Sequence, residues 1–263
     1  MKVFLSQLYP FHDKLEKNIA HLTRLIEAED RKMSPHDVLV LPELFGAESS
    51  KTDYHHALSM LARRNRIHVV GGSHHEQRGR GVVNCGAVAN PSGEIIARYE
   101  KLRPYGVESQ LGVCPGKSTA QFDIDGCRVL VLICADFWYS EVFLSRLTPR
   151  PDLILVPTFS ISSRPAPTAA RSLWRSMAVS RAYEFGVYVG ISDWAYPSTY
   201  HQLRSSSVAG LADPRPLRRD GFFSKLGRNA IDGFEIDLSR LKDLRQHRNR
   251  HAFLSDETLM GRR

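Results

Sequence analysis

The sequence VLVLICADFW, residues 129–138, carries the most structural information in the chain. Its first five residues are aliphatic or β-branched and follow a turn-forming Asp-Gly pair, which predicts a strand buried on both faces of a sheet. Cys134 ends the apolar run, and Ser140 with Glu141 has the composition of a helix start, with Ser140 as the N-cap. In α/β proteins, functional groups gather at the C-terminal ends of central strands. Cys134 is therefore either a nucleophile or, as most free cysteines are, a small core side chain.

Strands and amphipathic helices alternate along most of the chain, and this rhythm predicts an α/β fold. No repeat or linker composition interrupts it, so we expect residues 1–263 to form a single domain with two sheets. Two antiparallel hairpins are expected at 82–99 and 121–133. The other predicted elements are strands at 2–7, 38–41, 67–70, 152–157, 187–192, 205–209 and 233–236, and helices at 11–29, 54–65, 169–185 and 238–247.

Composition narrows the class of protein. The chain has 263 residues with 42% hydrophobic and 24% charged side chains, which is ordinary for a globular protein. No apolar run approaches the roughly 20 residues of a membrane helix, and residues 1–7 lack the long apolar core of a signal peptide. The four cysteines form no CxxC pair, so they suggest neither a zinc site nor a disulfide framework. We expect no membrane association and a reducing, cytoplasmic setting.

The net charge of +8 raises the question of nucleic acid. Basic side chains are densest in residues 213–250, where acidic side chains are interspersed among them. No aromatic-interleaved RNA-binding motif or zinc-finger spacing accompanies them. We therefore expect a solvated surface or a face for an acidic partner, and no nucleic-acid binding.

Three polar side chains stand where predicted strands end. Glu43 follows the strand at 38–41, and Lys101 follows the second strand of the first hairpin. Cys134 ends the strand at 129–133. If these strands are neighbours, a carboxylate, an ammonium and a thiol converge at one edge of the core. Taken singly, Glu43 could cap a loop and Lys101 could be a solvated surface lysine.

Together the three groups form a coherent set for nucleophilic catalysis. An ammonium and the N-terminal field of the following helix would each lower the pKa of the Cys134 thiol. A carboxylate could take the thiol proton and later activate water. Lys101 and the backbone N–H of Ala135 could stabilise a tetrahedral oxyanion. His74 and His75 are expected at the rim of the pocket, with metal binding as a weaker alternative.

These residues lie in segments that resemble motifs of the nitrilase superfamily, the carbon–nitrogen hydrolases. The resemblance extends along nearly the whole chain, and five motifs in order at family-like separations are specific. The matching segments are Leu41-Pro42-Glu43-Leu44, Tyr99-Glu100-Lys101-Leu102 after Asn84 and the Asn90-Pro91-Ser92-Gly93 turn, Leu132-Ile133-Cys134-Ala135-Asp136 with Glu141, Arg181-Ala182-Tyr183-Glu184, and residues 207–214.

The resemblance implies a four-layer α-β-β-α sandwich of two mixed sheets and a Glu-Lys-Cys triad. It implies no metal and no organic cofactor, and a homodimer or higher homo-oligomer. The implied mechanism is attack by Cys134 on an amide or nitrile carbon, followed by hydrolysis of the resulting thioester. Glu108 matches the second glutamate of many relatives and is expected to orient Lys101 or the substrate, although it could be a plain loop glutamate.

Two departures from the family pattern concern the substrate. Phe185 stands where an asparagine is expected, and Arg103-Pro104-Tyr105 replaces the usual sequence at the pocket mouth. Trp138 and Trp174 could line an apolar pocket, although such aromatic residues are more often core. The predicted substrate-binding residues are Ala135, Trp138, Tyr105 and Thr158.

The favoured function is hydrolysis of a small linear amide, carbamoyl or ω-amide substrate, with nitrile hydrolysis less favoured. The arginines and the His74-His75 pair would suit a carboxylate-bearing substrate by charge complementarity. Two alternatives stay open at this point. One is a non-catalytic binding or scaffold protein with the same fold, and the other is acyl transfer to an acceptor other than water.

Overall fold

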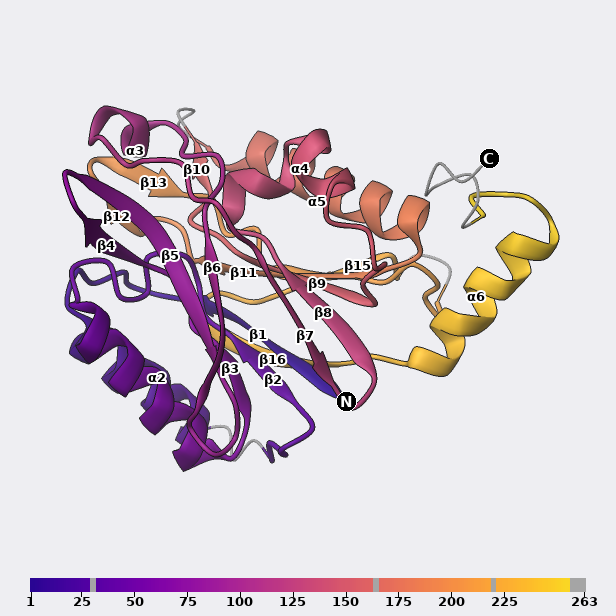
Figure 1. Ribbon diagram of the computed structural model, residues 1–263, viewed down its shortest axis with the longest axis horizontal. Helices are drawn as coiled ribbons and strands as arrows, with labels where there is room; N and C mark the ends of the chain where they lie inside the picture. The colour runs from indigo at the N-terminus through magenta and orange to yellow at the C-terminus, as the bar shows by residue number, and fades with distance from the viewer. Residues whose placement is uncertain (29–31, 163–165, 219–220, 256–263) are drawn as a thin grey trace.

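The computed structural model describes residues 1–28, 32–162, 166–218 and 221–255. Figure 1 shows the strands in the middle of the molecule, with α2 on one side and α4 and α5 on the opposite side. The helices are α1 (Leu15–Ala28), α2 (Lys51–Asn65), α3 (Val107–Gln110), α4 (Ser140–Leu144), α5 (Thr168–Phe185) and α6 (Leu238–Arg250), with a 3-10 turn η1 at Cys134–Phe137. Among the described residues, no helix has both the length and the hydropathy needed to span a bilayer.

The strands confirm the predicted α/β alternation. In chain order they are β1 (Lys2–Leu8), β2 (Val38–Val40), β3 (His68–Val70), β4 (His74–Arg78), β5 (Gly81–Ala89), β6 (Ile95–Glu100), β7 (Ala120–Ile124), β8 (Cys127–Val131), β9 (Leu153–Pro157), β10 (Ile161–Ser162), β11 (Tyr188–Trp194), β12 (Thr199–Tyr200), β13 (Leu203–Ser205), β14 (Gly210–Ala212), β15 (Phe223–Lys225) and β16 (Ala230–Glu235).

The central strands β3, β2, β1, β11, β9 and β8 are neighbours in that order and run parallel to one another. Antiparallel strands border them, so the arrangement is mixed. The pairs Gln7 with Asp193 and Leu8 with Trp194 connect β1 to β11, and through them the ladder is continuous over thirteen strands. A separate three-stranded sheet contains β10, β13 and β12. The mixed α/β class is confirmed, whereas a division into two distinct sheets is not visible in the hydrogen-bond ladder.

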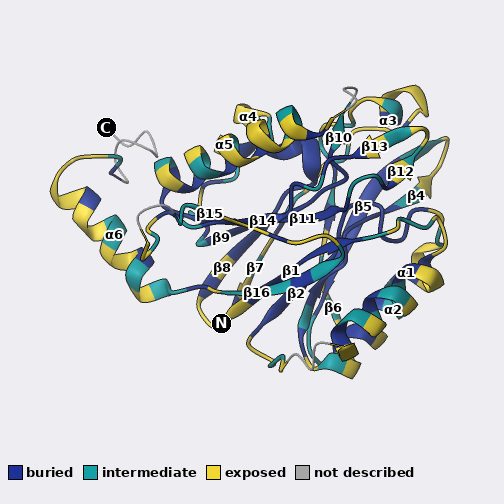
Figure 2. Cartoon of the chain, turned by 180° about the vertical axis from the view of Figure 1, so that it is seen from behind, coloured by how far each residue is buried: buried dark blue, intermediate teal, exposed yellow. Residues whose placement is uncertain are grey.

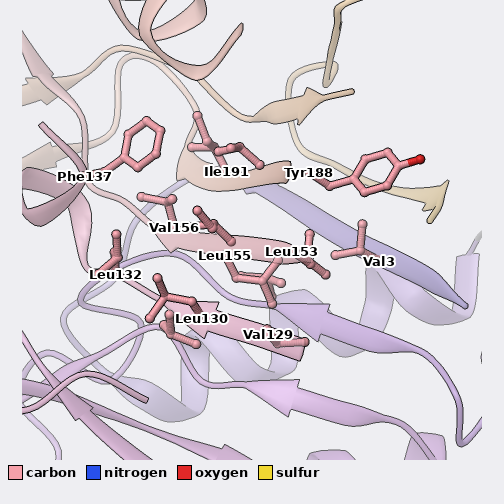
Figure 3. Close-up of a cluster of buried hydrophobic side chains, with 14 of the residues drawn as sticks. Val3, Val129, Leu130, Leu132, Phe137, Leu153, Leu155, Val156, Tyr188 and Ile191 are labelled. Atoms are coloured by element: carbon pink, nitrogen blue, oxygen red, sulfur yellow. The ribbon is translucent and has the colours of Figure 1, made fainter. Parts of the chain in front are cut away.

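Burial of both strand faces explains the continuous apolar runs. All five residues of β9, LILVP, are buried, as are all three of β2. Successive side chains of β1 enter different cores: Val3 and Leu5 pack with β8, β9 and α5, while Phe4 packs with α1 and α2. Figure 3 shows Val129, Leu153 and Ile191 in the first of these cores.

The long helices bury one face each. Trp174, Ala178, Ala182 and Phe185 form the buried side of α5, which packs on β11 and β14. Figure 2 shows the opposite sides of the outer helices exposed. α5 ends at Gly186 with a φ of 54°, a left-handed conformation that glycine adopts without a Cβ clash.

Arg245 and Arg248 of α6 depart from the expectation of a solvated basic face. Other basic side chains of the segment 213–250 are exposed as expected, namely Arg215, Arg218, Lys225, Arg228, Lys242 and Arg250. Arg245 donates to the carbonyl of Gly186 at 3.0 Å and pairs with Asp152 at 2.6 Å. Arg248 is buried, and its guanidinium lies 4.7 Å from the centre of the Tyr183 ring. These cations meet the carbonyl end of α5, where the helix dipole favours positive charge. They therefore join two helices. Arg219 and Asp220 of the same basic segment lie outside the described residues.

Three local predictions were wrong. β4 was missed because its sequence, HHEQR, has no apolar alternation. The strand predicted at 205–209 is absent: β13 ends at Ser205, and the N–H of Val208 donates to the Asp193 side chain instead of a neighbouring strand. Ser140 is not an N-cap, since α4 begins at Ser140 itself after Tyr139.

Candidate active site

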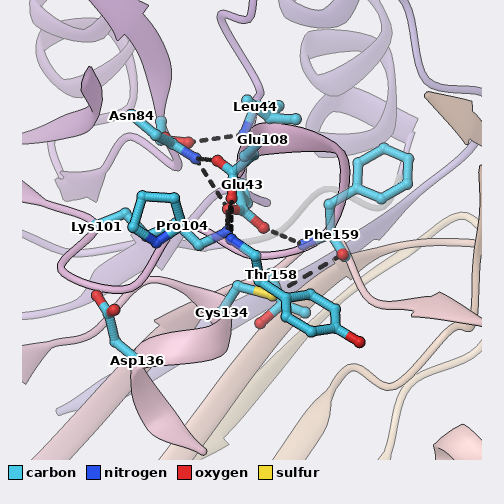
Figure 4. A network of polar contacts seen from close by, with 12 residues as sticks. Glu43, Leu44, Asn84, Lys101, Pro104, Glu108, Cys134, Asp136, Thr158 and Phe159 are labelled. Atoms are coloured by element: carbon cyan, nitrogen blue, oxygen red, sulfur yellow. Dashed lines mark hydrogen bonds and ion pairs between the residues drawn. The ribbon is translucent and has the colours of Figure 1, made fainter. Parts of the chain in front are cut away.

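The predicted site residues meet because they follow strands that point the same way. β2 is parallel to β3, and β6 is parallel to β3 because both pair antiparallel with β5. Glu43 follows β2 and Lys101 follows β6, while Cys134 follows β8 in the same parallel set. Figure 4 shows the three side chains converging from separate elements. The expected convergence is thus observed.

Glu43 is buried at the centre of a hydrogen-bond network. Its Oε1 accepts from Lys101 Nζ at 2.6 Å and from Asn84 Nδ2 at 3.0 Å, and its Oε2 accepts from the N–H of Phe159 at 2.8 Å. The indole of Trp194 donates to the Glu43 carbonyl at 2.7 Å, which holds the backbone as well. The carboxylate therefore has one orientation (Figure 4).

Lys101 is a buried cation between two carboxylates. Its Nζ pairs with Glu43 and with Glu108 on α3. The backbone N–H of Lys101 donates to the carbonyl of Asn84 at 2.9 Å. The pairing of β6 with β5 therefore extends to Lys101 and fixes the backbone that carries its side chain. Burial lowers the pKa of Lys101, but the negative charges of Glu43, Cys134 and Glu108 outweigh it and raise that pKa well above its usual value. The ammonium stays charged at neutral pH.

The two carboxylates have opposite pKa shifts. Burial raises the pKa of Glu43, despite the opposing charge of Lys101. Burial acts in the same direction on Glu108, but the charge of Lys101, the nearby His75 ring, and hydrogen bonds from Lys101 and Asn84 lower its pKa to about 2. Glu108 is therefore a permanent anion, whereas Glu43 is suited to taking up a proton. Pairs of groups with divergent pKa values commonly divide acid–base roles in this way.

Cys134 occupies a strained turn at the floor of the site. Its φ is 44°, which is uncommon for a non-glycine residue and clusters at functional positions. Burial, and then the charge of Glu43, raise the pKa of the Cys134 thiol well above its usual value, although Lys101 opposes them. Lys101 lowers this pKa as expected, but the net shift is opposite to the expected one because burial and Glu43 outweigh Lys101. In the resting protein Cys134 is a thiol, and deprotonation requires a base.

Asn84 and Asp136 lie in or beside the family-like motifs, but no role was predicted for either residue. Asn84 Nδ2 donates to Glu43 and also to Glu108 Oε1 at 2.6 Å, so it links the two carboxylates. Asp136 is buried and accepts from the N–H groups of Leu102 at 3.0 Å and Arg103 at 2.8 Å. It therefore ties the turn after Cys134 to the chain after Lys101. The position of Asp136, two residues after Cys134, could have indicated a role for it from the sequence. Nothing in the sequence around Asn84 indicates its role.

A cavity of about 350 Å³ opens above Cys134. Of the predicted substrate-binding residues, Ala135, Trp138 and Tyr105 line it. Thr158 does not: it is fully buried, and its hydroxyl donates to the carbonyl of Val156 at 3.3 Å. The other lining residues include Glu43, Leu44, Lys101, Val107, Glu108, Cys134, Tyr139, Phe159, Ser160, Ile161, Ala170, Leu173, Trp174, Tyr200 and Leu203.

The two histidines lie on β4, beyond the lining of the cavity. His75 Nε2 is 4.0 Å from Glu108 Oε1, which places this ring behind the site and not at its rim. His74 is buried against Tyr54, and burial lowers its pKa to about 4. His74, Glu76 and Cys85 have donor atoms close enough to share a metal ion. Arginine side chains already pair with Glu76, which reduces the attraction of that cluster for a cation.

The chain is similar to known amidases along most of its length. The 2-oxoglutaramate amidase of Bacillus subtilis (strain 168) is 27% identical over 249 residues, which cover 89% of this chain and 90% of that protein. Omega-amidase NIT2 of Homo sapiens is 27% identical over 223 residues, covering 81% of this chain and 76% of that protein.

Solved structures share the fold at lower identity. Nit3 of Saccharomyces cerevisiae, a member of branch 10 of the nitrilase superfamily, has a TM-score of 0.74 at 21% identity, covering 94% of this chain and 93% of that chain. A mutant of the Nesterenkonia AN1 amidase has a TM-score of 0.71 at 19% identity, covering 96% and 98%. Residues 2–210 match the sequence pattern of the carbon-nitrogen hydrolase family. This chain therefore belongs to the carbon-nitrogen hydrolase family.

Proposed function

We propose that this protein hydrolyses the C–N bond of a small amide, carbamoyl or ω-amide substrate through a thioester on Cys134. The observation that carries the proposal is the buried Glu43–Lys101 pair, with a separation of 2.6 Å, at the cavity that opens over the Cys134 thiol. The names of the similar amidases support an amide as the substrate.

In the first half-reaction Glu43 takes the proton of Cys134, and the sulfur attacks the amide carbon. The carbonyl oxygen becomes an oxyanion that accepts from Lys101 Nζ and from the backbone N–H of Ala135. When the C–N bond breaks, protonated Glu43 gives its proton to the nitrogen, and ammonia or an amine leaves. The raised pKa of Glu43 suits this exchange, because a base must release the proton again.

In the second half-reaction Glu43 takes a proton from water, whose oxygen attacks the thioester. The C–S bond breaks, the acid leaves, and the proton returns from Glu43 to the sulfur. Glu108, with its pKa lowered to about 2, stays negative throughout and holds Lys101 in its charged form. Asn84 donates to both carboxylates and so holds them in fixed positions relative to each other. No metal or organic cofactor enters this sequence of steps.

The test is ammonia release from a panel of primary amides by the wild type and by Cys134→Ala. We expect the variant to lose at least about 10⁴ of the rate, as for removal of other catalytic nucleophiles, with an unchanged melting temperature. Cys114→Ala, at an exposed cysteine outside the cavity, is the matched control and should keep full activity. Ammonia release retained by Cys134→Ala would refute the mechanism.

The same assay separates the alternative functions. One molecule of free acid per molecule of ammonia supports hydrolysis, whereas a deficit of acid indicates transfer to another acceptor. No release from any amide by the wild type favours a non-catalytic binding protein. Intact-mass detection of an acyl adduct, absent in Cys134→Ala, would establish the thioester.

Three finer expectations are part of this proposal. We infer a four-layer α-β-β-α arrangement, a homodimer or higher homo-oligomer, and a cytoplasmic location. Small-angle scattering would test the dimer. The packing of opposite faces of β1 into two different cores, with helices on opposite sides of the strands, supports the layering.

A further inference from the structure

We infer that the acyl part of the substrate is uncharged and apolar, and that Trp138, Leu173 and Trp174 select it. This inference rests on the proposed function, since it names the substrate class of the same site. It differs from the carboxylate-bearing substrate that the basic composition had suggested. The acyl group stays on Cys134 in the thioester, so residues beside Cys134 contact it in both half-reactions.

The first argument is the composition of the mouth of the cavity. We use "apolar mouth" for Trp138, Tyr139, Ile161, Leu173 and Trp174, which all line the cavity. Trp138 lies four residues after Cys134 in sequence, and Trp174 lies on α5. The two rings meet edge to face with centres 5.2 Å apart and form one wall of the cavity. The elements that carry the lining include α3, α5, β10 and β13, which lie along one side of the molecule in Figures 1 and 2.

The second argument is charge. Within the described part of the lining, the charged side chains are Glu43, Glu108 and Lys101. Lys101 is already paired with both carboxylates, and in the proposed mechanism its remaining N–H donates to the oxygen of the scissile amide, so no donor of Lys101 is left for a second anionic group of the substrate. A substrate carboxylate would meet two negative groups that share one positive group. Such juxtaposition of like charge disfavours binding.

The third argument concerns neighbouring arginines that could have reached the cavity. Arg103 pairs with Glu141 at 3.2 Å, and Arg181 donates to Ser140. Arg171 on α5 donates to the carbonyl of Ser206 at 2.6 Å, which directs it away from Leu173. Each is committed to a partner outside the lining. Among the described residues, these three arginines therefore supply no cation to the lining of the cavity.

The fourth argument is exposure and size. Leu173 is 58% exposed in the free protein, although it is a large apolar side chain at the cavity mouth. An apolar acyl group would cover it. The volume of about 350 Å³ is near the lower limit of small-molecule sites, roughly 300–1,000 Å³, so the acyl group is compact.

The test compares two amides of equal shape. 4-Methylpentanamide and succinamate differ in having an isopropyl group or a carboxylate at the far end. We expect kcat/KM to be at least about 10-fold higher for 4-methylpentanamide, the lower end of what apolar pockets discriminate. Leu173→Ala should reduce that ratio, and Leu173→Arg should raise kcat/KM for succinamate at least about 10-fold by supplying a counter-ion.

Leu144→Ala is the matched control, since Leu144 is also exposed but lies outside the lining. It should leave both rates unchanged. Faster turnover of succinamate by the wild type, or insensitivity of the ratio to both Leu173 variants, would overturn the inference while leaving amide hydrolysis intact. Absence of ammonia release from every amide would instead refute the proposed function.

Discussion

The two ends of the cavity differ in how far their side chains are already paired or packed within the protein. At the charged end, Glu43, Lys101 and Glu108 are buried, and each charge has a partner within the protein. At the apolar mouth, Leu173 is 58% exposed and Tyr139 is 39% exposed, so both are open to contact with a ligand in the cavity. The charged end is fully paired in the absence of substrate, whereas the apolar mouth is partly exposed. We therefore assign the chemical steps to the charged end and the choice of substrate to the apolar mouth.

This difference has energetic consequences. Removing one member of a buried ion pair leaves an uncompensated charge, which destabilises a protein by about 3–5 kcal/mol. Truncating an exposed apolar side chain usually changes stability by less than about 0.5 kcal/mol. Substitutions at the charged end should therefore reduce both activity and stability, whereas those at the mouth should change only substrate binding.

Lys101→Met is expected to have the largest effect. It removes an oxyanion donor, which by itself lowers kcat about 10²–10³-fold, and it leaves Glu43 and Glu108 facing each other without a cation. We expect loss of measurable activity and a lower free energy of unfolding in urea. Lys117→Met, at an exposed lysine, is the control and should match the wild type. An active and fully stable Lys101→Met protein would contradict the claim that the charged end supports both activity and stability.

Glu108→Gln is expected to have a smaller effect that depends on pH. The pKa of Glu108 is lowered to about 2 from an ordinary value of 4.5, so its charge stabilises the fold above pH 4.5 and ceases to do so as the pH falls toward 2. This contribution, about 3 kcal/mol at 1.36 kcal/mol per unit, should be missing in the variant.

The measurement is the free energy of unfolding between pH 6 and pH 2.5 for the wild type, Glu108→Gln and Glu141→Gln. Glu141 is exposed and serves as the control, so its variant should retain the wild-type slope. We also expect kcat for Glu108→Gln to fall about 10–100-fold, since an orienting charge is lost while the nucleophile and base remain. Equal acid sensitivity of all three proteins would contradict the role given to Glu108.

Tyr105→Ala should give the smallest effect. Tyr105 lines the cavity but is 57% exposed, and only its backbone N–H contacts Glu108. We expect KM to rise about two- to fivefold, with kcat and melting temperature unchanged, because a partly solvated contact contributes little free energy. A loss of kcat similar to that of Glu108→Gln would show that Tyr105 acts in catalysis, as the residues of the charged end do. That result would contradict the difference proposed between the two ends of the cavity.

Local patterning was sufficient to predict much of this protein. Alternating strands and helices, the turns of the hairpins and the polar residues that end the strands are properties of neighbouring residues. These features predicted the α/β class and the convergence of Glu43, Lys101 and Cys134, because parallel strands present their C-terminal ends at one edge. The family resemblance added Glu108, which strand patterning alone would have left as a loop residue.

Tertiary structure decided the rest. The direction of the Cys134 pKa shift depends on burial and on Glu43, which lies 91 positions earlier in the sequence. Thr158 turns into the core, and the α6 arginines turn toward α5, because of partners that sequence patterns do not reveal. The apolar mouth is assembled from several separate segments. Desolvation and charge–charge distance are set by packing between remote segments, and for that reason the sequence determined which groups were present while the fold determined how they behave.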